Sequence, residues 1–144
     1  MHVNVKPGRI IVGRLKKGDD LLDALQKICS DQEIRLGDIR ALGAVKSARI
    51  AYYDQDRREY FFVDLAKHLE LLALTGNVSI RDGKPFIHAH ATFADSKGEA
   101  FGGHVAEGTE VFACEFSIRE YLSDTAFERA MDDETGLFLW RQDA

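Results

Sequence analysis

Hydrophobic and polar residues alternate with period two over much of this chain, and the alternation predicts a protein built mainly of β-strands. The clearest example is the segment 86–93, where positions 87, 89, 91 and 93 are apolar and positions 88, 90 and 92 are polar. Successive side chains of a strand point to opposite faces, so this segment would bury one face and leave the other polar. Other segments with a strand pattern are 9–15, 39–53, 59–65, 68–80 and 111–121.

One segment follows a helical spacing instead and predicts the main helix. Apolar residues recur from Leu21 to Cys29 at the three- and four-residue intervals of one helix face. The preceding Gly18-Asp19-Asp20 offers an N-cap and an acidic first turn, both of which favour the start of a helix. We expect this helix to run to about Gln32.

Glycines and the C-terminal tail modify the simple pattern of strands. Gly43 predicts a bulge or bend within its strand, and Gly76-Asn77 predicts an interruption of another. In the tail, residues 126–131 suggest a helical turn and residues 136–140 suggest a short final strand.

The order of these elements predicts an α+β fold, a single compact domain with a mostly antiparallel β-sheet and one main helix. The 144 residues have the length of one domain, and no linker, low-complexity tract or internal repeat divides them, so we assign residues 1–144 to that domain. A domain of this length buries roughly 70% of the surface of its unfolded chain. We therefore expect the fold to persist without a bound metal.

Composition and charge argue against several classes of function. The 24 acidic and 19 basic residues give a net charge of −5, which disfavours a dedicated nucleic-acid surface. No apolar stretch approaches the roughly 18 residues of a membrane span, and the N-terminus lacks the apolar core of a signal peptide, so we expect a cytoplasmic protein without membrane partners. The two cysteines, Cys29 and Cys114, fall in phase with apolar neighbours and are expected to be buried, unreactive thiols.

The most informative feature is a predicted β-hairpin that carries three of the five histidines. A three-residue loop, Ser96-Lys97-Gly98, with glycine where a positive φ is favoured, would join the arms and fix their register. In that register His90 lies directly opposite His104, and His88 lies diagonally across the strands. Opposed Cβ atoms are about 5 Å apart and diagonal ones about 7 Å, so three imidazoles can close on one cation. The pattern predicts a metal site of His88, His90 and His104 for zinc or another divalent transition metal.

Other interpretations of this hairpin stay open. Histidines on the polar face of a hairpin are often only solvated, and a change of one residue in the loop would move His104 to the opposite face. Gly102 and Gly103 precede His104 on its strand, where glycine is unfavourable relative to alanine. They predict either the close approach of another backbone or ligand, or a bulge that displaces His104.

Five motifs occur in order along the chain, namely Gly43-Ala44-Val45, Leu74-Thr75-Gly76-Asn77, Gly83-Lys84-Pro85-Phe86-Ile87-His88-Ala89-His90, Gly102-Gly103-His104 and Asp133-Glu134-Thr135-Gly136-Leu137. Together they resemble the plants-and-prokaryotes conserved (PPC) domain family, with a core that covers about residues 9–140. The resemblance implies a compact α+β fold that assembles as a homotrimer. In bacterial and archaeal members the equivalents of His88, His90 and His104 are metal ligands, usually assigned as zinc.

The resemblance also bears on partners. Plant members couple this domain to AT-hook segments that bind the minor groove of A·T-rich DNA, and a DNA-binding label extends to the family. This chain has no Arg-Gly-Arg-Pro core, so we expect its DNA binding to be weak or absent. The run Tyr60-Phe61-Phe62-Val63 is apolar on both faces and favours a subunit interface that covers it. The expected partners are other copies of this chain and a small molecule or protein of unidentified class.

Two classes of function are compatible with these features. The first is a homotrimeric metal-binding module with a binding or regulatory role. The second is a metal-dependent enzyme, because three neutral imidazoles leave a fourth zinc position open to a small-molecule substrate. No catalytic residue is assigned: Glu107 and Glu110 follow His104 closely, and Arg40 and Arg49 could hold an anionic ligand, but ordinary exposed side chains are the commoner outcome for all four.

Overall fold

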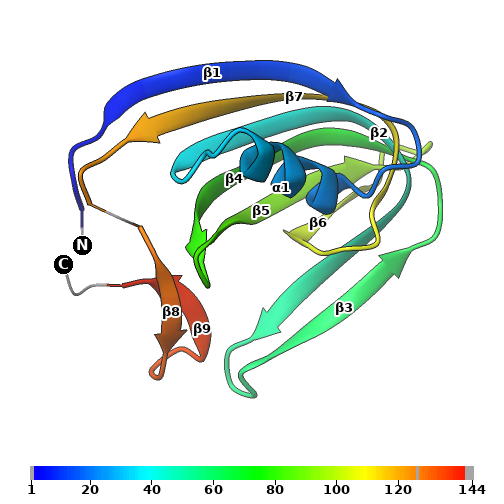
Figure 1. Ribbon diagram of the computed structural model, residues 1–144. Helices are drawn as coiled ribbons and strands as arrows, with labels where there is room; N and C mark the ends of the chain where they lie inside the picture. The colour runs from blue at the N-terminus through cyan, green and yellow to red at the C-terminus, as the bar shows by residue number, and fades with distance from the viewer. Residues whose placement is uncertain (1, 126, 142–144) are drawn as a thin grey trace.

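A curved antiparallel sheet with one helix packed against it makes up most of the molecule (Figure 1). The computed structural model describes residues 2–125 and 127–141. The elements are β1 (Lys6–Leu15), α1 (Leu21–Asp31), β2 (Gly37–Asp54), β3 (Glu59–Leu65), β4 (Leu69–Arg81), β5 (Lys84–Ala94), β6 (Ala100–Val105), β7 (Glu110–Leu122), β8 (Arg129–Asp132) and β9 (Leu137–Trp140). This architecture confirms the predicted α+β fold. In the described part of the chain, no helix is long and apolar enough to cross a membrane.

The long strand β2 organises the sheet of seven strands. Along the main path the strand order is β1-β7-β2-β4-β5-β6. The N-terminal part of β2 pairs with β7 on one side and β4 on the other, whereas residues 48–54 pair with β3. Ile50 and Ala51 also pair with Val105 and His104 of β6. The sheet therefore curls until its edge strand β6 returns to the half of β2 that carries β3.

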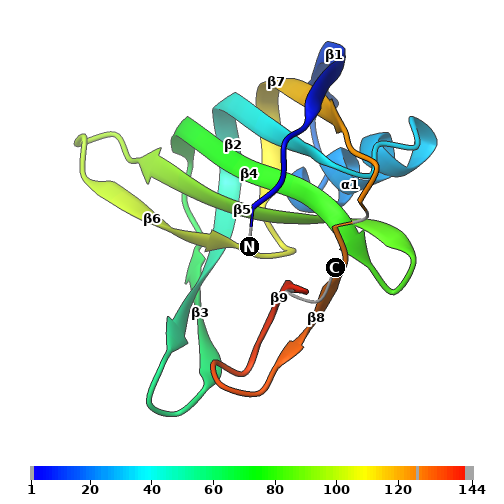
Figure 2. The same ribbon diagram turned by 90° about the vertical axis from the view of Figure 1, so that its left-hand side faces the viewer.

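The C-terminal hairpin of β8 and β9 forms a second, two-stranded sheet, and in both ribbon views its turn approaches the turn between β2 and β3 (Figures 1 and 2). The expected helical turn at residues 126–131 is wrong for residues 127–131, because Glu128 forms a bridge with Ile80 and residues 129–131 belong to β8 and pair with β9. Ladder hydrogen bonds to β9 satisfy backbone groups that a single helical turn would leave unpaired. Ala126 lies outside the described residues. The expected final strand is confirmed.

Gly43 and Gly76 act differently within their strands. The ladder between β2 and β4 shifts between Ala41 and Gly43, as predicted, and Gly43 has a φ of +149°. A Cβ at Gly43 would lie 2.1 Å from a backbone oxygen of β7, so no side chain fits there. The expected interruption at Gly76-Asn77 is wrong, because Gly76 pairs in register with both Ile39 and Ala89. Glycine at this position allows β5 to lie close, since a Cβ would be 2.7 Å from a β5 backbone oxygen.

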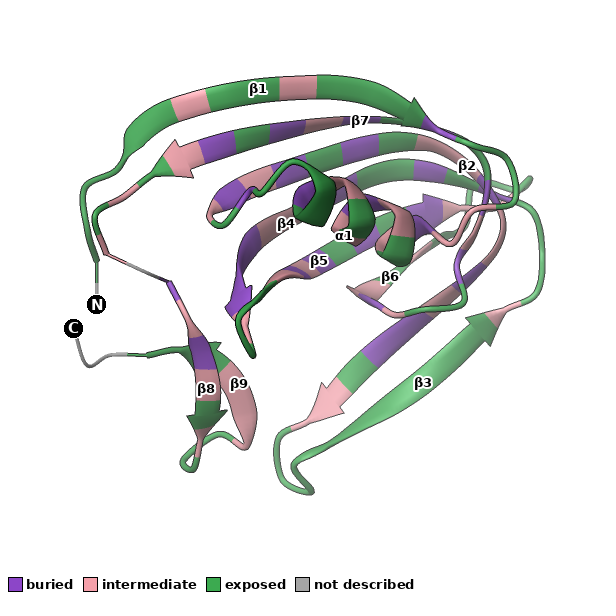
Figure 3. Ribbon diagram, viewed as in Figure 1, coloured by how far each residue is buried: buried purple, intermediate pink, exposed green. Residues whose placement is uncertain are grey.

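The core lies between α1 and the side of the sheet that faces it (Figure 3). Leu21, Leu25 and Cys29 of the helix are fully buried, at the spacing predicted from the sequence. The Asp20 side chain caps the helix by accepting hydrogen bonds from two backbone N–H groups of its first turn. Cys114 of β7 is also buried. Burial raises the pKa of Cys29 to about 12 and that of Cys114 to about 11, so both thiols are protonated and unreactive, as predicted.

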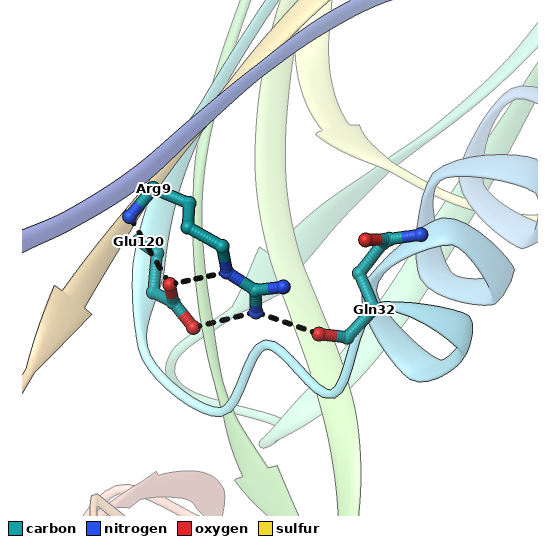
Figure 4. Close-up of polar contacts among 3 residues, drawn as sticks. All are labelled: Arg9, Gln32 and Glu120. Atoms are coloured by element: carbon teal, nitrogen blue, oxygen red, sulfur yellow. Dashed lines mark hydrogen bonds and ion pairs between the residues drawn. The ribbon is translucent and has the colours of Figure 1, made fainter.

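An ion pair fastens the first strand to its neighbours. The Arg9 guanidinium donates to both carboxylate oxygens of Glu120 on β7, at 2.8 and 2.9 Å (Figure 4). The same guanidinium donates to the backbone oxygen of Gln32, directly after α1, at 2.7 Å. The hydrogen bond from Arg9 lowers the pKa of Glu120. Strands β1 and β7 and the end of the helix are thereby joined at one end of the sheet.

The face of the sheet that points away from α1 carries exposed apolar side chains. Val12, Leu42 and Leu72, from three neighbouring parts of the sheet, surround one shallow hollow and are 74%, 56% and 54% exposed. Ile10 lies on the same face as Val12, because residues two apart on a strand share a face. We call Ile10, Val12, Leu42 and Leu72 the open face.

Candidate metal centre

The hairpin of β5 and β6 has the register predicted from its loop. The Asp95 N–H donates to the Glu99 oxygen at 3.1 Å, and Gly98 has a φ of +79°. His90 pairs with His104 in the ladder between the strands. The apolar residues of β5 are buried on one face, so its histidines project from the other.

Two glycines let β6 lie close to the strands beside it. A Cβ at Gly102 would lie 2.8 Å from the Ala91 oxygen on β5, and a Cβ at Gly103 would lie 2.9 Å from the Ala51 oxygen on β2. The ladder between β5 and β6 is continuous. Of the two interpretations of these glycines, the close approach of another backbone is confirmed, and the bulge that would displace His104 is not formed.

His88, His90 and His104 form one compact cluster. The ring centroids are 5.1 Å apart for His88 and His90, 5.0 Å for His88 and His104, and 5.5 Å for His90 and His104. One potential ligand atom from each residue lies within 4.8 Å of the others. Nitrogen ligands of a tetrahedral zinc site, at Zn–N distances of about 2.0–2.1 Å, are roughly 3.4 Å apart. Small ring rotations would therefore bring all three nitrogens to one cation.

The surroundings keep two of these imidazoles neutral. Burial lowers the pKa of His88 to about 4, and electrostatic repulsion from the neighbouring His104, Arg129 and His90 side chains acts in the same direction. Burial, His90 and Arg129 also lower the pKa of His104. A metal binds the neutral form of imidazole. At neutral pH these two side chains thus present free lone pairs.

The cluster opens into a cavity of about 720 Å³. Its walls come from β2, β3 and their turn, from β5 and β6, and from the turn of the C-terminal hairpin. The centroid of the Tyr60 ring lies 5.3 Å from that of the His104 ring and 4.9 Å from that of the Tyr53 ring. An aromatic wall therefore adjoins the histidines. A cavity of this size is in the range of about 300–1,000 Å³ that is typical of small-molecule sites.

Two hairpin turns meet at the rim of this cavity. The Tyr53 hydroxyl donates to the Thr135 backbone oxygen at 2.7 Å, and Arg58 Nη1 donates to the Asp133 backbone oxygen at 3.0 Å. Figure 2 shows the two turns side by side at the lower end of the molecule. A Cβ at Gly136 would lie 2.8 Å from the Tyr53 hydroxyl, so the turns fit closely. Residues about 80 positions apart in the sequence therefore form one rim.

A buried arginine lies beside the cluster, on the same face of the sheet. Arg129 is 8% exposed and donates hydrogen bonds to Ser79 Oγ at 2.8 Å, Asn77 Oδ1 at 2.7 Å and the Phe138 oxygen at 2.9 Å. Asn77 is the ladder partner of His88 on β4. Burial lowers the pKa of Arg129. Among the described residues its hydrogen bonds go only to uncharged groups, so no direct partner neutralises its charge there.

The other candidate residues lie away from the cluster. Glu110 forms an ion pair with a lysine of β2, Glu107 is exposed, and neither lines the cavity. Arg40 borders the hollow on the open face, and Arg49 pairs with Asp64 of β3 at 3.4 Å. These four residues take no part in the histidine site.

The cavity also contains residues that the sequence analysis assigns to no site. They are Tyr53, Arg58 and Tyr60 from the β2–β3 hairpin, and Glu134 and Thr135 from the C-terminal hairpin. In the sequence, Arg58 is half of an ordinary basic pair at a turn, and its place becomes clear only when two distant turns meet. Two signals could have pointed to this wall, namely the aromatic residues near the first turn and the motif at residues 133–137.

Comparison with known proteins identifies relatives of this chain. A family model described as the Plants and Prokaryotes Conserved (PCC) domain matches residues 2–122. The matched segment contains the three histidines and ends before the C-terminal hairpin.

Solved structures share the whole fold. A metal-containing protein from Archaeoglobus fulgidus is 43% identical, with a TM-score of 0.92, and the alignment covers 99% of this chain and 100% of that one. A plant- and prokaryote-conserved (PPC) protein from Pyrococcus horikoshii is 33% identical, with a TM-score of 0.93 and coverage of 99% and 97%. A proposed DNA-binding protein from Ralstonia eutropha JMP134 is 25% identical, with a TM-score of 0.80 and coverage of 90% and 89%.

Among curated proteins, the bifunctional protein GlmU from Synechococcus sp. (strain JA-2-3B'a(2-13)) is 30% identical over 124 residues. The match covers 85% of this chain but 18% of that protein, so the chain spans about a fifth of the length of the curated relatives it matches. The likeness therefore concerns one segment of those longer proteins.

Proposed function

The chain belongs to the Plants and Prokaryotes Conserved domain family, and on that basis we propose that it is a homotrimeric metal-binding protein with a binding or regulatory role. The observation that carries the proposal is the cluster of His88, His90 and His104, whose potential ligand atoms lie within 4.8 Å of one another. The 43% identical Archaeoglobus fulgidus protein, which is described as metal-containing, supports it.

The donor set suits a divalent transition metal. Imidazole is a common ligand of zinc, copper, iron and nickel, and zinc is our first candidate. When bound, such a metal supplies Lewis acidity and lowers the pKa of a bound water toward about 7. The chain's own contribution is to hold three imidazoles on one paired hairpin, two of them neutral through burial, beside a cavity that can admit a ligand.

The surface of the single chain supports self-association. The open face presents four apolar side chains, and residues 60–63 of β3 are exposed as well. Exposure of such apolar patches to water is unfavourable, and a subunit interface would bury them.

Metal analysis tests the proposal most directly. Protein purified without an affinity tag should contain one divalent metal ion per chain, as measured by inductively coupled plasma mass spectrometry. If it is purified without metal, it should take up one zinc ion per chain on dialysis against zinc. A protein that stays free of metal after dialysis against zinc would contradict the proposal.

A metal-dependent enzyme is the second candidate, and the cavity beside the histidines favours it. An enzyme of this kind should hydrolyse a small chromogenic ester faster with zinc than without, and the difference should vanish in the His90→Ala variant purified in the same way. Equal rates for the zinc-loaded protein, the metal-free protein and the variant would favour the binding module.

For nucleic acid we infer weak or absent binding by this chain. The similar Ralstonia eutropha protein is a proposed DNA-binding protein, but this chain carries a net charge of −5. Few phosphates could be neutralised by such a surface, and phosphate neutralisation dominates affinity for DNA.

A further inference from the structure

The cavity beside the histidines would carry an excess of positive charge once it held a divalent metal. Three neutral imidazoles leave both charges of such a cation uncompensated, and an uncompensated charge in a partly buried site is costly. Arg58 adds a guanidinium to the lining, and Glu134 supplies the one carboxylate among the described lining residues. Arg129 adds a buried guanidinium beside the cluster. The excess is local, since the whole chain has a net charge of −5.

Arg58 has further N–H groups that could donate hydrogen bonds to an anion. One of its N–H groups bonds to the Asp133 backbone oxygen, and a guanidinium has five. Two hydrogen bonds from Thr135 to the Asp132 carboxylate lower the pKa of Asp132, and the charge of the nearby Arg58 adds a smaller effect in the same direction. Within the described residues no carboxylate lies within ion-pair distance of Arg58.

The remaining walls favour an apolar body rather than a bare inorganic ion. Tyr52, Tyr53, Tyr60 and Leu137 all line the cavity, and its volume of about 720 Å³ far exceeds that of a small oxyanion. The Tyr60 ring adjoins His104, and the Tyr53 ring adjoins Tyr60. A ligand with an aromatic or aliphatic body can bury apolar surface against this wall.

We propose that this cavity binds a small organic carboxylate whose charge offsets the metal and Arg58 and whose apolar body packs against the tyrosines. A carboxylate offers two coplanar oxygens, which match the geometry of a guanidinium. The inference rests on the proposed function, because the charge excess requires a metal at the three histidines.

Benzoate is a suitable probe, with benzamide as its uncharged analogue and acetate as a carboxylate without a ring. In calorimetric titrations of the zinc-loaded protein, benzoate should bind once per chain, and benzamide and acetate at least about tenfold more weakly. Removal of the metal should lower the affinity for benzoate by a similar factor. Inorganic phosphate that binds as tightly as benzoate would overturn the inference in favour of a simple oxyanion site.

Two arginines of one turn provide a matched pair of variants. Arg58→Gln should weaken benzoate binding about tenfold, consistent with the loss of a charge-assisted hydrogen bond. Arg57→Gln removes the same charge from the neighbouring residue, which lies over the Phe61 ring and does not line the cavity, and should leave the affinity unchanged. Equal affinities in Arg58→Gln and the unmodified protein would overturn the role of Arg58.

Zinc content measured on the same samples separates this inference from the proposed function. Full zinc occupancy without benzoate binding would overturn the carboxylate site and leave the metal site intact. A chain that binds no zinc would overturn both. Circular dichroism melting of Arg58→Gln and of Arg58→Lys shows whether each variant is folded, and Arg58→Lys should keep more affinity than Arg58→Gln because it retains the charge.

Discussion

His90 and His104 face each other across the ladder between β5 and β6, with ring centroids 5.5 Å apart. Backbone pairing sets this separation, so the relationship depends on the hairpin rather than on the imidazoles themselves. Removal of either ring should therefore abolish metal binding and leave the sheet in place.

We expect His90→Ala to lose its metal, because two imidazoles hold a divalent cation far more weakly than three. Elemental analysis should show near-zero zinc, while the far-ultraviolet circular dichroism stays unchanged. His68→Ala is the matched control, since His68 is exposed and outside the cluster. Unchanged metal content in both His90→Ala and His104→Ala would show that this cluster is not the metal site.

The stability of the metal-free protein should fall in mild acid. The pKa of His88 is about 4 in the folded chain, against an ordinary value of about 6.5 when unfolded. Between these values the unfolded chain binds a proton that the folded chain does not, so the free energy of unfolding decreases as the pH falls from about 6.5 to about 4. Urea unfolding at several pH values measures this, and His88→Gln should flatten the dependence. Identical slopes for the two proteins would refute the assignment.

Two glycines with positive φ should respond differently to substitution. At Gly43 a Cβ would meet a backbone oxygen at 2.1 Å, whereas at Gly98, with φ +79°, nothing lies within 4 Å. Gly43→Ala should cost about 3 kcal/mol or more in the free energy of unfolding, and Gly98→Ala about 1 kcal/mol from backbone strain alone. Denaturant titration would show this, and equal losses would mean that β2 and β7 can move apart at Gly43.

Light scattering should give a mass of about three times 16.2 kDa for the protein in solution. Leu42→Lys places a charge on the open face and should shift the mass toward that of a single chain. Met131→Lys is the control, because Met131 is 52% exposed, close to the 56% of Leu42, but lies on β8. A stable monomer of the unmodified protein at micromolar concentration would rule out the trimer.

Titration with an A·T-rich duplex at physiological salt should show weak or no binding. With a net charge of −5, the chain has no excess of basic side chains that could displace counterions from the duplex. Sub-micromolar affinity that falls steeply with added salt would reverse this expectation and make nucleic acid the first candidate partner.

Local sequence was sufficient for the features that depend on neighbouring residues. Gly98 and its loop determine the hairpin register, and strand alternation then determines the face on which His88 lies. Gly76 shows the limit of this approach, because whether a glycine breaks a ladder or admits a close strand depends on the partner strand. Arg58 shows a second limit, because its position in the cavity depends on the packing of two turns that are distant in sequence.

The C-terminal hairpin lies beyond residue 122, where the family match ends, yet its turn supplies part of the cavity wall. The three histidines and the opposite wall thus belong to separate stretches of the chain. A new residue at 134 or 135 would alter which molecules enter without touching the strands that hold the imidazoles.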